Sequence, residues 1–182
     1  MEAGYDRMVE EILEDNKDQI IDEFVTERMA SYYAKHPDFD VPAKNAIQDA
    51  RDLLNSHPTA SLVFSGSATE MALRDVLLKP VVYGMVHEES TAEGIAGLVI
   101  KNSKFKTLLF DILKKHGVDL EKTKRPTSAD TLWMEINKFK ALRNRVLHSG
   151  EKATREDAEI SLELTEIIIE GVFPHLRKKI GI

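Results

Sequence analysis

Arg143, Asn144 and His148 stand close together near the C-terminus and combine the side chains that phosphate chemistry uses. A guanidinium binds a phosphate through two parallel hydrogen bonds, an imidazole transfers protons at cellular pH, and an amide orients either group. The spacing therefore indicates an anion site with acid–base capacity. A structural alternative stays open, in which Arg143 forms a buried ion pair and His148 ends a helix.

These residues lie in a predicted helix, 129–148, which begins at a capping residue, Thr127 or Ser128. At about 100° per residue, the apolar side chains of this helix form one stripe, and Arg143 falls in the middle of it. A guanidinium there must be paired or must line a cavity, because an isolated buried charge is very costly. The stripe consists of Leu132, Ile136, Phe139, Val146 and Leu147.

His148 belongs to a second stripe of the same helix, together with Asn144. It lies about 140° away from Arg143 around the helix axis. One helix therefore does not bring the two side chains together, whereas fraying at Ser149-Gly150 or a second copy of the helix would do so. The C-terminal end of the helix dipole favours a protonated imidazole at His148, which suits a proton-transfer role.

Glu70 is the candidate partner of Arg143. It lies on an upstream predicted helix that starts near Ser65 or Ser67, and a carboxylate on the flank of its apolar face can neutralise and orient a guanidinium. The alternative is a capping role, because Ser67 and Glu70 have the spacing of a capping box.

The chain is acidic, with 25 Lys and Arg against 31 Asp and Glu in 182 residues. A protein of this charge can meet a polyanion only through a local basic patch. The basic residues nearest the site are the candidates, and the alternative for each is a solvated surface charge. They are Lys140, Arg145, Lys152 and Arg155.

Several classes of chemistry are excluded or disfavoured. The chain has no cysteine, so disulfides, thiolate metal sites and a cysteine nucleophile are excluded. Its histidines have no metal-ligand spacing, and no nucleotide-binding glycine motif occurs, so we expect no metal and no cofactor. Residues 1–16 lack the apolar core of a signal peptide, and no apolar run approaches the roughly 20 residues of a membrane span. We therefore expect a cytoplasmic protein without a membrane partner.

The sequence predicts an all-α fold in a single domain, because turn residues are sparse and no segment alternates between apolar and polar residues as a strand does. Thr154 and Asp157 have capping-box spacing at the start of the last helix, which we expect to pack antiparallel to the helix before it. The predicted helices cover 5–34, 43–55, 65–86 with a kink at Pro80, 91–101, 104–116 ending at Gly117, 129–148 and Thr154–Phe173.

The run 142–150, LRNRVLHSG, resembles the signature of the HEPN superfamily ("higher eukaryotes and prokaryotes nucleotide-binding" domains). That signature is R-x(4–6)-H, often R-N-x-x-x-H, and Arg143, Asn144 and His148 match it. Its place also matches, at the end of the penultimate long helix. The segment 67–74, SATEMALR, is similar to an earlier core helix of the family. The resemblance covers 65–173 and implies a HEPN-like antiparallel bundle, with residues 1–60 as an additional N-terminal helical elaboration.

Many HEPN proteins are metal-independent endoribonucleases that act as homodimers across a shared cleft. The resemblance therefore implies cleavage of single-stranded or loop RNA to a 2′,3′-cyclic phosphate and a 5′-hydroxyl. His148 would transfer protons, Arg143 would stabilise phosphorane charge, and Asn144 would orient His148 or the phosphate. The resemblance also implies that the protein is a toxin or defence effector, with a protein inhibitor or antitoxin as a further partner. Two alternatives stay open: a HEPN-fold module that dimerises and binds a nucleotide or partner without cutting, and an unrelated helical regulator.

Overall fold

The computed structural model describes residues 26–99, 107, 110–111 and 113–182. Within these ranges the regular elements are all helices, so the all-α prediction is confirmed. Of the first predicted helix, only its last part is described, as α2 (Thr26–Lys35). The predicted helices 91–101 and 104–116 also lie partly outside the described residues, and the first of them overlaps α6 (Glu89–Val99), which begins two residues earlier than predicted.

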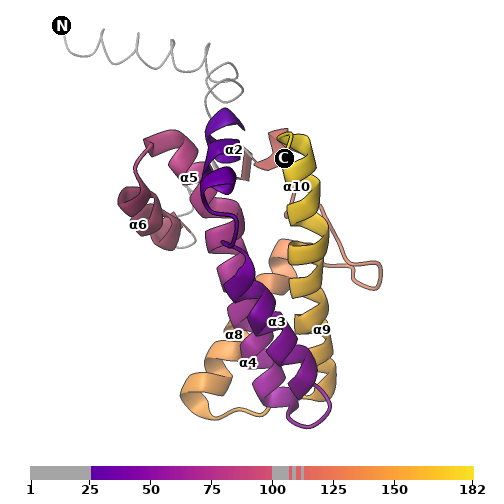
Figure 1. The fold of residues 1–182 in the computed structure, drawn as a ribbon. Helices are drawn as coiled ribbons and strands as arrows, with labels where there is room; N and C mark the ends of the chain where they lie inside the picture. The colour runs from indigo at the N-terminus through magenta and orange to yellow at the C-terminus, as the bar shows by residue number, and fades with distance from the viewer. Residues whose placement is uncertain (1–25, 100–106, 108–109, 112) are drawn as a thin grey trace, which may run out of the picture.

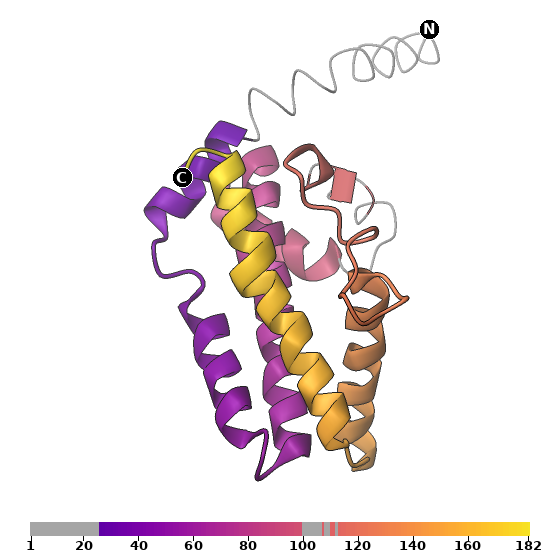
Figure 2. The same cartoon turned by 90° about the vertical axis from the view of Figure 1, so that its right-hand side faces the viewer.

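Helix α4 (Pro58–Met71) is the centre of a helical bundle (Figure 1). Three helices pack against it: α3 (Val41–Leu53), α8 (Leu132–Ser149) and α9 (Arg155–Glu166). Short connections make α3 antiparallel to α4, and α8 antiparallel to α9 as predicted (Figure 2). The arrangement places the inner face of α8 against α4, where Glu70 lies.

Helices α4 and α9 run parallel and share a buried seam of small hydroxyl side chains. Ser65 Oγ lies 2.7 Å from Ser161 Oγ, and one turn further on Thr69 Oγ1 lies 2.7 Å from Thr165 Oγ1. All four residues are buried. Small side chains allow the two helices to approach closely, and the paired hydroxyls satisfy one another away from water. The seam fixes the register of α9, and through the short turn that of α8, against α4.

Two long helical rods, one that starts with α4 and one that starts with α9, each contain a π-helical segment followed by a proline. Helix α4 continues as η2 (Ala72–Leu78) and α5 (Lys79–Val86), and α9 continues as η3 (Ile167–Val172) and α10 (Phe173–Lys179). Proline lacks an N–H and clashes with the carbonyl four residues earlier, and a widened turn relieves that conflict.

A widened turn also changes one prediction. The last helix does not end at Phe173, before Pro174, but continues to Lys179. Pro80 cannot donate to the carbonyl of Val76, and that carbonyl accepts instead from the hydroxyl of Tyr33 at 2.6 Å. Burial raises the pKa of Tyr33 well above its usual range, so the hydroxyl stays protonated as a donor.

Two helix starts differ from the prediction. Helix α4 begins at Pro58, about two turns before Ser65, because proline suits a first helical position that needs no N–H donor. Ser67 is therefore inside the helix, where its hydroxyl donates to the carbonyl of Val63, and no capping box forms with Glu70. Helix α8 begins after Thr131, whose hydroxyl accepts from Met134 N, and not at residues 127–128.

The start of α9 follows the prediction. The Thr154 side chain accepts from Asp157 N, and the Asp157 carboxylate accepts from Thr154 N, which completes the capping box. Gly117 and Gly150 both have positive φ, at 80° and 68°, as expected for residues that end a helix.

Arg125 fixes the connection before α8 to the bundle. Its side chain is only 7% exposed and contacts the Glu135 carboxylate through Nε and Nη2, at 2.8–3.2 Å. Its Nη1 donates to Glu163 of α9 at 2.5 Å. One residue of a loop therefore joins α8 to α9 through a buried ion-pair cluster.

Candidate active site

Arg143 lies on the face of α8 that packs against α4. Its Nη1 donates to Glu70 Oε2, so the structure brings the predicted pair together. The Arg143 side chain is 17% exposed and that of Glu70 is 35% exposed, which places the pair at the edge of the core. No described residue accepts a hydrogen bond from Arg143 Nη2. The guanidinium is thus anchored at one nitrogen and keeps another for a ligand.

Lys140 adds a second cation to the pair. Its Nζ lies 3.5 Å from Glu70 Oε1, one helical turn before Arg143. Glu70 therefore bridges two cations with its two oxygens, and the three side chains together carry one positive charge. A local net positive charge of this kind is what an acidic protein needs in order to attract a phosphate to the Glu70 site.

A narrow crevice opens beside this cluster, with a volume of about 20 Å³. Its lining includes Gly66, Glu70, Asn137 and Lys140. The volume admits about one water molecule and not a nucleobase. Phe139, in its wall, is buried, and Trp133 packs edge-on against Phe110 with ring centroids 5.0 Å apart. Neither ring presents an open stacking platform, so RNA at this site would lie on the surface.

Asn144 and His148 are exposed and lie on other sides of α8 from Arg143. His148 follows Arg143 by five residues, which is about 7.5 Å along the axis and about 140° around it. Gly150 ends the helix cleanly, and its N–H donates to Val146 O, so His148 keeps its helical position. Fraying does not bring the two side chains together in this structure, and one chain leaves them apart.

The outer face of α8 carries a straight row of exposed residues. The row has the alternating spacing of three and four residues that is typical of a coiled-coil contact. It begins at Met134, which is 56% exposed, and ends at His148. Ala141 in its middle is small enough to allow a close approach by another helix. The row consists of Met134, Asn137, Ala141, Asn144 and His148.

The other candidate RNA-binding residues gather where α8 turns into α9. Arg145 donates to Glu151 at 2.7 Å, and Arg155 donates to Glu159 at 2.7 Å. Glu151 raises the pKa of Arg145 further above its usual range. Lys152 is exposed, and no carboxylate of the described residues lies within 4 Å of it. Three of the four candidate cations are thus already paired, since Lys140 contacts Glu70, and Lys152 is the one without a carboxylate partner among the described residues.

The described part of the chain contains no group of three histidine, aspartate or glutamate residues that could hold a metal ion. In the same residues no helix is both long and apolar enough to cross a membrane.

Gly66 is the site residue that the sequence analysis missed. It lies one turn before Glu70, under the stem of Arg143. Because α4 was predicted to start at Ser65 or Ser67, Gly66 was placed outside the helix or at its start. A glycine four residues before a candidate ion-pair partner, inside a longer helix, was the available signal.

Comparisons with protein-family models, curated proteins and solved structures find no match to this chain.

Proposed function

We propose that this protein is a metal-independent endoribonuclease that cleaves single-stranded or loop RNA. The observation that carries the proposal is the state of Arg143, which Glu70 anchors at Nη1 while Nη2 has no acceptor among the described residues. Asn144 and His148 are exposed on the same helix, within two turns. A guanidinium fixed at one nitrogen and an accessible imidazole on the same helix are the two groups that phosphate transfer needs, although one chain holds them on different faces of α8.

The reaction uses the nucleophile that RNA itself carries. A neutral His148 accepts the proton of the 2′-hydroxyl as its oxygen attacks phosphorus. Arg143 donates to a non-bridging oxygen and stabilises the charge that develops there. A protonated imidazole gives its proton to the departing 5′-oxygen. The products are a 2′,3′-cyclic phosphate and a 5′-hydroxyl, and DNA is resistant because it lacks the attacking group.

Two copies of the chain supply the two imidazoles. The exposed row on α8 is the contact surface, with a two-fold axis parallel to the helix, so that each residue of the row faces the same residue of the other copy. Ala141 lets the helices approach, and the His148 side chains of both copies then lie at one interface. One imidazole acts as base and the other as acid.

The dimer is tested by light scattering at micromolar concentration. The expected mass is twice the 20.6 kDa of one chain. Ala141→Glu places a charge in the middle of the row and shifts the mass toward that of one chain, whereas Lys178→Glu, at the exposed end of α10, leaves it unchanged. A parent protein that stays monomeric contradicts the two-copy mechanism.

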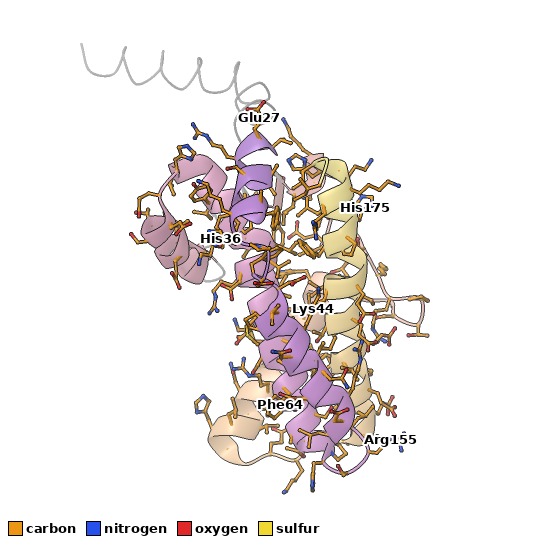
Figure 3. The ribbon with its side chains drawn as sticks, in the orientation of Figure 1. Glu27, His36, Lys44, Phe64, Arg155 and His175 are labelled. Carbon is orange, nitrogen blue, oxygen red and sulfur yellow. The ribbon has the colours of Figure 1, made fainter. Side chains whose placement is uncertain are left out.

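Cleavage is tested with single-stranded RNA in excess EDTA. We expect His148→Ala and Arg143→Ala each to slow cleavage by on the order of 10²-fold or more. His175→Ala and Arg177→Ala are matched controls, because both residues are exposed on α10, at the opposite end of the rod from Arg155 (Figure 3). The product ends are identified by enzymatic labelling. A requirement for Mg²⁺, or full activity of both site variants, contradicts the mechanism.

The exposed row on α8 also favours a second function, a dimerisation module that binds a nucleotide or protein partner without cutting it. A stable dimer that cleaves no RNA, and whose assembly depends on Ala141, supports that function.

A further inference from the structure

We infer that Gly66 is a positioning residue for Arg143, and that its missing side chain is the space in which the arginine stem lies. The inference rests on the proposed function only in that it assigns a catalytic purpose to the position of Arg143. The placement itself follows from the packing of α4 against α8.

The space above Gly66 is occupied by the methylene groups of Arg143. A Cβ atom added at residue 66 would lie 2.8 Å from Arg143 Cδ, 3.5 Å from Cγ and 3.6 Å from Cβ. Ordinary carbon–carbon contact begins near 3.4 Å, so the Cδ atom would have to move by about 0.6 Å to reach it. Any residue other than glycine therefore moves the stem of Arg143 away from α4.

Two neighbouring turns of α4 hold the methylene groups and the guanidinium of Arg143. Gly66 receives the stem, and Glu70, four residues later, binds Nη1. Between these two points the Nε atom is buried and has no hydrogen-bond partner in the described part of the chain. The position of Arg143 is thus set by the space above Gly66 at one end and by the charge of Glu70 at the other, and Nη2 keeps no acceptor among the described residues.

Nothing in the backbone requires a glycine at residue 66. It lies inside α4 and does not have a positive φ. Glycine in a helix interior is less favourable than alanine. Gly94 in α6 is the contrasting case, since an added Cβ there meets nothing within 4 Å. Glycine at residue 66 lowers the stability of α4, and the close packing of Arg143 against this residue offsets that loss. Gly94 has no such contact.

A double-mutant cycle in thermal unfolding tests the packing part of the inference. Gly94→Ala is the control and should raise Tm by about 1–4 °C through helix propensity alone. Gly66→Ala should lower Tm in the parent protein, and should raise it like the control when Arg143→Ala has emptied the space. An equal rise in both backgrounds overturns the inference. If Gly66→Ala alone does not fold, a folded double variant supports the inference, and an unfolded double variant beside a folded Arg143→Ala overturns it.

The second readout is the rate of RNA cleavage. A displacement of about 1 Å at a charge-stabilising group costs on the order of 10²-fold in rate. We expect Gly66→Ala to lower kcat by that order with little change in KM, and Gly94→Ala to leave both unchanged. Unchanged kcat in Gly66→Ala overturns the positioning role even if the thermal cycle shows the contact. If the parent cleaves no RNA, the proposed function fails, and the thermal cycle still decides whether Gly66 seats Arg143.

Discussion

Replacement of Arg125 by alanine should be the most destabilising single substitution of a charged residue among those described above. The guanidinium contacts two carboxylates, and their environments differ. Glu163 is 42% exposed and can return to water, but the Glu135 side chain is 7% exposed and would remain as an unpaired buried charge. Breaking a buried pair by removing one partner costs about 3–5 kcal/mol. For a domain of this size, that loss corresponds to a decrease in Tm of roughly 6–20 °C.

The assay is urea unfolding monitored by far-UV circular dichroism. The urea midpoint and the dependence of the unfolding free energy on urea concentration are fitted together. Arg155→Ala is the control, because the exposed pair of Arg155 with Glu159, four residues apart, is worth no more than about 0.5 kcal/mol. The double variant Arg125→Met with Glu135→Leu should recover most of the loss, since it leaves no buried charge without a partner. An Arg125→Ala variant no less stable than the Arg155 control would refute the reasoning.

The same cluster predicts a pH dependence. Hydrogen bonds from Arg125 hold the pKa of Glu135 below its usual range. The resulting stabilisation is complete above the pKa of glutamate in the unfolded chain, about 4.3, and is lost as the pH falls through the lower folded value. The difference in unfolding free energy between the parent and Arg125→Ala should therefore narrow below about pH 4. A difference that stays constant from pH 7 to pH 3 would contradict this assignment.

Three further outcomes follow from local contacts. Tyr33→Phe should lower the unfolding free energy by about 1–3 kcal/mol, because the buried Val76 carbonyl loses its donor, and chemical denaturation measures this. Thr154→Ala should cost about 1 kcal/mol by removing the capping box of α9, and a loss below about 0.3 kcal/mol would contradict that role. The Glu88 carboxylate accepts hydrogen bonds from Thr91 and Ser90, and these bonds lower the pKa of Glu88 to about 2. An NMR titration of the Glu88 carboxyl carbon checks this value.

Local signals in the sequence were sufficient where one residue and its neighbours determine the structure. The capping box at Thr154 and the glycine at 117 were predicted and are present. The helical wheel also placed Arg143 on the packed face and His148 elsewhere, because both residues lie in one uninterrupted helix. The pairing of Arg143 with Glu70 was predicted from the wheel of each helix separately, and it is the one long-range contact of the site that the sequence indicated.

The remaining features depend on contacts between distant segments. Arg125 lies between the predicted helices 104–116 and 129–148, and nothing near it in the sequence indicates that Glu163 of α9 will meet it. The start of α4 was placed too late, because Ser65 and Ser67 resemble capping residues although both lie inside the helix. The exposed row on α8 was recognised in part, but its exposure is set by what α4 and α9 leave uncovered. Tertiary packing decides each of these cases.

The paired π-helical turns make the two long rods interdependent. A widened turn delays the rotation of a helix, so deleting one residue from η2 would turn all of α5 by about 100° relative to α4. The segments η2 and η3 touch, and each precedes its proline by one intervening residue. A chimera joined between the two ends of the bundle should therefore take both η2 and η3 from the same parent. The end that contains α5 and α10 keeps its orientation relative to the end that contains Arg143 only when both rods keep their widened turns.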